Sequence, residues 1–106
     1  MREVAINLPA GAADKDVVYA IDAASREVGL RQVSKGSLGK YPGSVHWHYK
    51  SGDQPGTLEI TYWPKQGRAW FALRANRRAP WMDAAVPQLK LNIERWLIST
   101  RSQVRA

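Results

Sequence analysis

The sequence predicts an α+β fold, a two-layer sandwich in which two helices cover one face of a mostly antiparallel sheet. Three segments with alternating apolar residues follow one another through short loops, which is typical of an antiparallel meander. Two other segments carry apolar residues at helical spacing, so each has one face to bury. The 106 residues suffice for one domain, 1–106, with a single core.

The first part of the chain predicts a strand, a helix and a second, short strand. Residues 2–8 alternate in hydropathy, as a half-buried strand does. Residues 14–28 have the helical spacing, and Asp14 is the expected N-cap because its carboxylate can accept hydrogen bonds from the first turn. With a short strand over 30–35, this unit can form a right-handed parallel crossover.

The middle of the chain predicts a loop and the three-strand meander. Residues 36–44 are rich in glycine and are expected to form a mobile basic loop beside the sheet, with Lys35 and Lys40 as ligand contacts. The loop lacks the spacing of a phosphate-binding Walker motif. The strands of the meander are expected over 44–50, 57–63 and 68–75.

The last helix is expected to start at Ala84, with Asp83 as its N-cap. That start places Pro87 in the first turn, where its missing amide hydrogen removes no hydrogen bond. The polar tail over 100–106 is expected to fray.

The composition excludes several classes of function. The chain has no cysteine, which excludes disulfides, thiol nucleophiles and cysteine-bound metals. No apolar run approaches the roughly 20 residues that span a bilayer, and the N-terminal apolar run is too short for a secretory signal. We therefore expect a cytoplasmic protein with no membrane partner, and no cofactor is assigned.

The positive charge is concentrated in the middle of the chain. The net charge is +7, and residues 31–80 alone hold nine Lys or Arg against two Asp or Glu. A basic surface concentrates polyanions, and each phosphate that it neutralises releases counterions. Nucleic acid or another polyanion is therefore the favoured partner, although a charge of this size also serves solubility.

Alternation along the meander divides its side chains between two faces of the sheet. The apolar set is expected in the core beneath the helices: Val45, Trp47, Tyr49, Leu58, Ile60, Tyr62, Ala69, Phe71 and Leu73. The opposite set is expected to face solvent: His46, His48, Lys50, Glu59, Thr61, Trp63, Arg68, Trp70 and Arg74.

Tryptophans among basic residues on an open sheet face suggest a surface for single-stranded nucleic acid. Trp63 and Trp70 would stack on bases, while the cations, including the adjacent Arg77 and Arg78, would hold phosphates. Two alternatives remain open. Trp70 can pack against Arg68 or Arg74, or under the 36–44 loop. The same face can also be the contact of a homodimer or of a partner-binding protein.

The two histidines suggest three possible roles. His46 and His48 lie on one face of a strand, and Glu59 can join them from the next strand. This set could bind zinc, but two histidines make a common motif, so we expect hydrogen bonding with mild pH dependence and assign no metal site. A His48–Glu59 pair could also serve acid–base catalysis in a hydrolase of phosphodiesters or sugars. No catalytic residue is assigned, and a non-enzymatic binding module is favoured.

Overall fold

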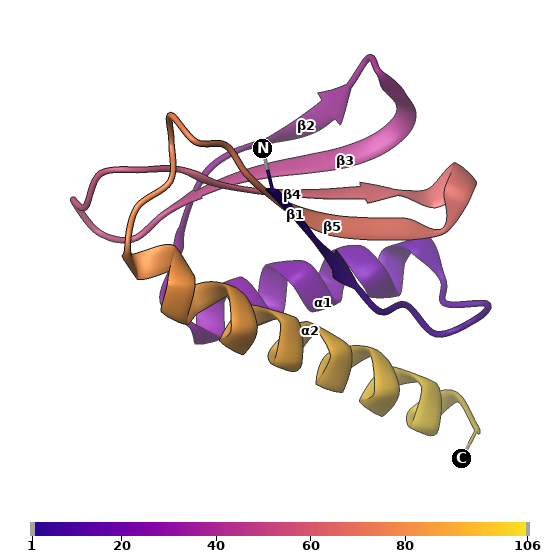
Figure 1. The fold of residues 1–106 in the computed structure, drawn as a ribbon. Helices are drawn as coiled ribbons and strands as arrows, with labels where there is room; N and C mark the ends of the chain where they lie inside the picture. The colour runs from indigo at the N-terminus through magenta and orange to yellow at the C-terminus, as the bar shows by residue number, and fades with distance from the viewer. Residues whose placement is uncertain (1, 106) are drawn as a thin grey trace.

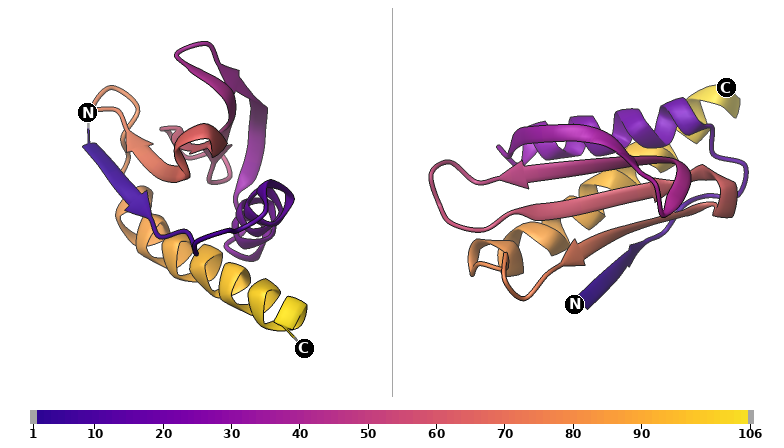
Figure 2. Two further views of the ribbon diagram at one scale, coloured as in Figure 1. Left: turned by 90° about the vertical axis from the view of Figure 1, so that its right-hand side faces the viewer. Right: turned by 90° about the horizontal axis from the view of Figure 1, so that it is seen from above.

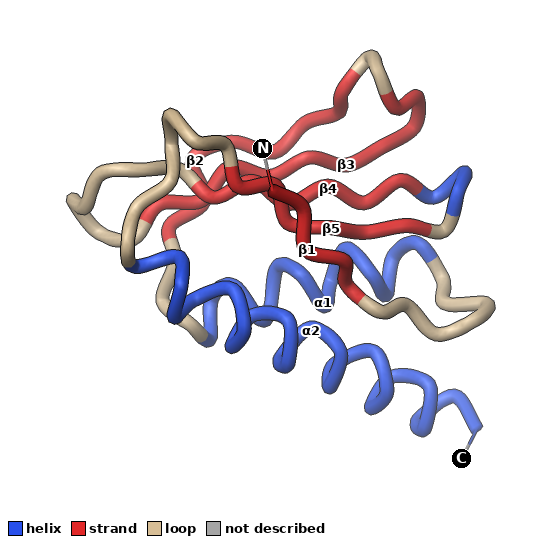
Figure 3. The backbone as a smooth tube through the Cα atoms, in the orientation of Figure 1, coloured by secondary structure: helices blue, strands red, loops and turns tan. Residues whose placement is uncertain are grey.

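The computed structural model describes the backbone of residues 2–105 and the side chains of residues 2–99. The described residues form a five-stranded antiparallel sheet with two helices on one of its faces (Figures 1 and 3). This arrangement confirms the predicted two-layer α+β fold. The tail over 100–106, which is predicted to fray, lies outside the residues whose side chains are described.

The strands of the meander lie side by side in the middle of the sheet. The order across the sheet is β1-β5-β4-β3-β2, and every neighbouring pair is antiparallel. The first two strands therefore point in the same direction, as the predicted crossover requires, but they form opposite edges and no parallel pair. The short hairpin loops keep β3, β4 and β5 adjacent, so the meander fills the space between those edges. The strands are β1 (Arg2–Ile6), β2 (Arg31–Leu38), β3 (Tyr41–Lys50), β4 (Leu58–Trp63) and β5 (Arg68–Leu73).

The first helix, α1 (Asp14–Glu27), starts where the sequence predicts, but its N-cap differs. Ala13 is the N-cap residue and makes no side-chain hydrogen bond, so the predicted cap at Asp14 is wrong. Asp14 instead accepts a hydrogen bond of 2.6 Å from the hydroxyl of Tyr62 on β4. The Asp14 carboxylate thus binds the sheet instead of the amides of the first helical turn.

The second helix, α2 (Trp81–Arg105), begins three residues before the predicted start at Ala84. Asp83 therefore lies in the first turn rather than at the N-cap, and Pro87 lies inside the helix. The early start has a tertiary cause, because the Trp81 indole donates a 2.9 Å hydrogen bond to the Pro55 carbonyl in the β3–β4 loop. Within the described residues, no helix has the length and apolar character needed to cross a membrane.

The core lies between the helices and one face of the sheet, as predicted. Val17 and Ile21 of α1, together with Leu89 and Ile93 of α2, meet the sheet with no exposed surface. Val45 is half-buried at the margin of this core. The other predicted core residues of the meander are all buried: Trp47, Tyr49, Leu58, Ile60, Tyr62, Ala69, Phe71 and Leu73.

The sheet curves into a trough, with the helices on its convex side (Figure 2, left). The β2–β3 hairpin forms one wall, and most of the predicted loop over 36–44 belongs to its two strands. Only Gly39 and Lys40 form the turn. The prediction of a long loop is wrong because register shifts accommodate the glycines within the hairpin: one lies between Gln32 and Ser34, and one follows Gly36. Such irregularities bend a strand and increase its twist, which curls the hairpin toward the concave face.

Candidate functional site

The concave face of the sheet is largely covered, although neither α1 nor α2 lies on it (Figure 2). Four residues that the sequence predicts to face solvent are between 1% and 8% exposed, namely His46, Glu59, Thr61 and Trp70. The prediction is wrong for these four because it treats the sheet as flat. Curvature of the hairpin and the long side chains at the margins of the trough shield the middle of the face.

The aromatic end of the trough is packed internally. Tyr41, at the start of β3, lies over both tryptophans, with ring centroids 4.9 Å from Trp63 and 5.1 Å from Trp70. The Arg68 guanidinium lies 4.8 Å from the Trp70 ring, as one of the sequence alternatives predicts. The Trp63 indole is half-buried and donates a 3.0 Å hydrogen bond to the Pro42 carbonyl. Trp70 is therefore not available to stack on a base in this structure.

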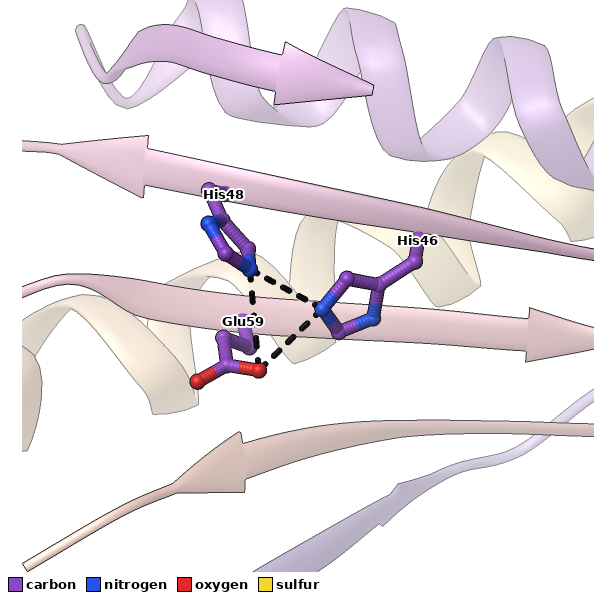
Figure 4. Close-up of side chains that lie close together, drawn as sticks. All are labelled: His46, His48 and Glu59. Carbon is purple, nitrogen blue, oxygen red and sulfur yellow. Dashed lines mark hydrogen bonds and ion pairs between the residues drawn. The ribbon is translucent and has the colours of Figure 1, made fainter. Parts of the chain in front are cut away.

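Two histidines and a glutamate converge in the middle of the trough (Figure 4). His46 Nε2 lies 3.0 Å from His48 Nε2 and 3.1 Å from Glu59 Oε1. His48 Nε2 lies 3.7 Å from the same carboxylate oxygen. Three polar atoms with lone pairs thus occupy one small region of a buried sheet face.

The register of the sheet explains this convergence. His46 and His48 are two residues apart on β3, so both side chains project from the concave face. His48 is paired with Glu59 across the β3–β4 ladder, and His46 is paired with Thr61. The Thr61 hydroxyl lies 2.7 Å from His46 Nδ1 and fixes the orientation of that ring.

Two arginines at the mouth of the trough hold the other oxygen of the glutamate. Arg74 Nε donates a 2.7 Å hydrogen bond to Glu59 Oε2, and Arg77 lies 3.4 Å from it. A 2.9 Å hydrogen bond from the Arg77 amide to the Arg74 carbonyl closes the turn that brings both side chains over the carboxylate. Their side chains are 47% and 44% exposed, whereas that of Glu59 is 2% exposed. The buried charge is thus paired, while both cations still reach solvent.

The surroundings of His46 favour its neutral form. Burial lowers the pKa of its imidazole, and the nearby His48 and Arg74 lower it further. Glu59 opposes this effect by Coulombic attraction and by its hydrogen bond, but the pKa remains below the usual value. A neutral His46 keeps one ring nitrogen with a free lone pair.

A pocket of about 470 Å³ opens over this cluster. Its floor includes His46, His48 and Glu59, and Arg74 and Arg77 lie at its margin. A second hollow of about 230 Å³ continues along the face toward Tyr41 and Trp70 and shares four residues with the first. The shared residues are Leu38, His46, Glu59 and Arg74.

Several predicted ligand contacts are engaged elsewhere. Lys35 is paired with Trp47, a core residue, so its side chain projects toward the helices and forms a 2.9 Å ion pair with Asp22 of α1. The Lys50 ammonium donates a 3.0 Å hydrogen bond to the Gly56 carbonyl.

The three remaining cations also lie apart from the histidine cluster. Arg78 forms a 2.9 Å ion pair with Asp83 at the start of α2. Lys40 and Arg68 lie at the aromatic end of the trough, where Lys40 is 5.6 Å from the Tyr41 ring centroid. Of the predicted site residues, the structure therefore brings six together: His46, His48, Glu59, Thr61, Arg74 and Arg77.

Among the residues of β2 that line the wall of the pocket, only Lys35 is a predicted ligand contact. Residues 34–38 of β2 line one side of the pocket, and Asn76 lies near the arginines. Residues 34–38 could have been found from the pairing of β2 with β3, which places Ser34 opposite His48 and Gly36 opposite His46. Assignment of 36–44 to a loop concealed that pairing.

Comparison of the chain with known protein families, with curated proteins and with solved structures found no match.

Proposed function

We propose that this protein is a small binding module that holds an anionic ligand in the trough, and that the ligand is single-stranded nucleic acid. The observation that carries the proposal is the pair of half-exposed arginines, Arg74 and Arg77, at the mouth of the 470 Å³ pocket. Their guanidinium groups match the geometry of phosphate oxygens and keep donors that Glu59 does not use.

The distribution of groups along the trough supports an extended ligand. Arginines lie at one end, the polar cluster lies in the middle, and the half-buried rings of Tyr41 and Trp63 lie at the other end with Arg68 and Lys40. From Glu59 to Trp63 the strand spans roughly 13 Å, which accommodates about two nucleotides of an extended strand. In this proposal Trp63 keeps its predicted stacking role, and Tyr41 takes the place of the buried Trp70.

The two other function classes have less support. A dimer through the tryptophan face would require exposed indoles, yet Trp70 is 3% exposed and is covered by Tyr41 of its own chain. A hydrolase would use the His46–Glu59 contact of 3.1 Å, but the other carboxylate oxygen of Glu59 is held by Arg74 and Arg77.

The test is a fluorescence anisotropy titration with a labelled single-stranded oligonucleotide at several salt concentrations. We expect affinity to fall with salt, because bound phosphates release counterions. In Arg77→Gln the affinity should fall for every sequence, and the slope of log affinity against log salt should decrease by about 0.7, the value for one phosphate contact on a single strand. Arg77 is chosen because its 3.4 Å contact with Glu59 is the longer of the two arginine contacts.

The matched control is Arg95→Gln, which removes the same charge from an exposed position on α2 in the helix layer. Its affinity should change little, and its salt slope should stay that of the unmodified protein. Equal losses in both variants would show that only net charge matters and would reject the pocket as the binding site. Absence of binding at low salt would reject the nucleic-acid proposal.

A further inference from the structure

The cluster of His46, His48 and Glu59 has no evident structural purpose. Glu59 and His46 are 2% and 8% exposed, so their polar atoms have lost most of their contact with water. Apolar side chains on these strands would cover the same sheet face without this desolvation penalty. Buried polar groups in a pocket wall are a common sign of a binding site.

We propose that His46, His48 and Glu59 bind a divalent transition-metal ion of the zinc class. The three candidate ligand atoms are the Nε2 atoms of the two histidines and Oε1 of the glutamate, which all lie within 4.8 Å of one another. Imidazole and carboxylate groups are ligands that zinc uses at sites with three protein ligands. This inference goes beyond the binding of an anionic ligand and does not depend on it.

The distances within the cluster fit such an ion. The ligand atoms form a triangle with sides of 3.0, 3.1 and 3.7 Å. Ligand atoms of a tetrahedral zinc ion, bonded at about 2.0–2.1 Å, lie roughly 3.3 Å apart. A point about 2 Å from all three atoms therefore exists close to the plane of the triangle. The cluster needs only small side-chain movements to accept the ion.

Hydrogen bonds behind the ligands hold two of them in the required orientation. With a proton on Nδ1, His46 donates to the Thr61 hydroxyl at 2.7 Å, and its Nε2 lone pair then points into the cluster. Arg74 holds Oε2 of Glu59 at 2.7 Å and leaves Oε1 for the ion. Partners of this kind fix the tautomer and orientation of metal ligands, and their loss typically reduces metal affinity about 10–100-fold.

One tautomer of His46 leaves all three atoms able to bind a metal ion. A carboxylate oxygen only accepts hydrogen bonds, and a neutral imidazole offers one N–H. If His46 donates its N–H to the Thr61 hydroxyl, its Nε2 lone pair faces the cluster, and either the N–H of His48 or a metal ion can occupy the space between the three atoms. A proton can bridge only two of these atoms, whereas a metal ion would bind all three at once.

The charge around the site defines what the bound ion would attract. One carboxylate and two neutral imidazoles leave a divalent ion with excess positive charge, and Arg74 and Arg77 add to it. Because the ligands line the pocket, a fourth ligand can approach from it. The occupied site therefore favours an anionic oxygen in the open position, such as one from a phosphate group.

The test is isothermal titration calorimetry of the untagged protein with zinc chloride, supported by the visible absorption spectrum of added Co²⁺. The chain suits this test, because it has no cysteine and no histidine other than His46 and His48. We expect one zinc ion per chain. In His48→Ala the affinity should fall at least tenfold, and in Thr61→Val it should fall about tenfold. Gln88→Ala, an exposed substitution on α2, should leave the affinity unchanged.

If a variant fails to fold, a measurement on the unmodified protein still tests the proposal. In the nitrogen NMR spectrum of the unmodified protein, one equivalent of zinc should shift the Nε2 signals of both histidines. Absence of binding at millimolar zinc would overturn the inference, and so would unchanged Nε2 signals or equal affinity in His48→Ala. Zinc binding without oligonucleotide binding would support the metal site and reject the proposed function. Oligonucleotide binding without zinc binding would support the proposed function and reject the metal site.

Discussion

Gly56 connects the backbone of the β3–β4 loop to the turn that carries the arginines. Its φ angle is +97°, which favours glycine, and an added Cβ would lie 2.7 Å from the Arg77 carbonyl and 2.8 Å from the Cβ of Ala79. The next residue, Thr57, donates a 3.0 Å hydrogen bond to the same carbonyl. The position of Arg77 over Glu59 thus depends on a residue that touches neither side chain.

Replacement of this glycine should therefore affect both stability and binding. We expect Gly56→Ala to lower the free energy of unfolding by at least about 2 kcal/mol, because it adds overpacking to backbone strain. Chemical denaturation measures the loss, and the anisotropy titration should show weaker oligonucleotide binding. The control is Gly52→Ala, where φ is +54° but nothing lies within 4 Å of the added Cβ. A cost there of about 1 kcal/mol is expected; equal costs in both variants would contradict the role of the close contact.

At the scale of elements, the β2–β3 hairpin is the feature that turns a sheet face into a pocket. Its curl places Tyr41 over the two tryptophans and places residues 34–38 beside the histidines. The alternation in β3 and β4 predicted which side chains share the concave face. It could not predict their burial, because burial depends on register shifts in β2 and on a contact between residues more than twenty positions apart.

Removal of the Tyr41 ring should expose the Trp63 and Trp70 side chains that it covers. We expect Tyr41→Ala to cost about 1–3 kcal/mol of stability, since two aromatic contacts are lost. The indole N–H signals of Trp63 and Trp70 should shift in the NMR spectrum, and both indoles should exchange faster with solvent. Lys40→Ala, at the neighbouring position, should leave these signals nearly unchanged. Unchanged indole signals in Tyr41→Ala would show that the hairpin does not cover the tryptophans in solution.

At the scale of the whole molecule, burial is distributed unevenly across the sheet. Five of the six residues of β4 are buried, whereas seven of the eight residues of β2 are exposed. The inward-facing residues and the helices were predictable because they follow hydropathy periods of two and 3.6 residues. The caps at Asp14 and Asp83 were not, because Tyr62 binds the Asp14 carboxylate and because α2 starts two residues before Asp83.

This gradient of burial predicts a gradient of local stability. In hydrogen exchange measured by NMR, the amides of β4 and β5 should exchange slowest, because they open only when the core opens. The amides of β2 should exchange fastest among the strands, because its hairpin can separate from β3 without disrupting the core. Uniform protection across the five strands would instead indicate that the wall and the core open as one unit.

The two register shifts in β2 determine more than the shape of one strand. The floor of the pocket lies on β3 and β4, and one of its walls is the edge strand β2. The angle between β2 and the rest of the sheet therefore sets the distance from this wall to Arg74 and Arg77. Insertion or loss of a residue between Gln32 and Leu38 would change the width of the pocket and leave His46, His48 and Glu59 in place. Ligand size and binding chemistry are therefore encoded in separate segments of this chain, and either can vary while the other is retained.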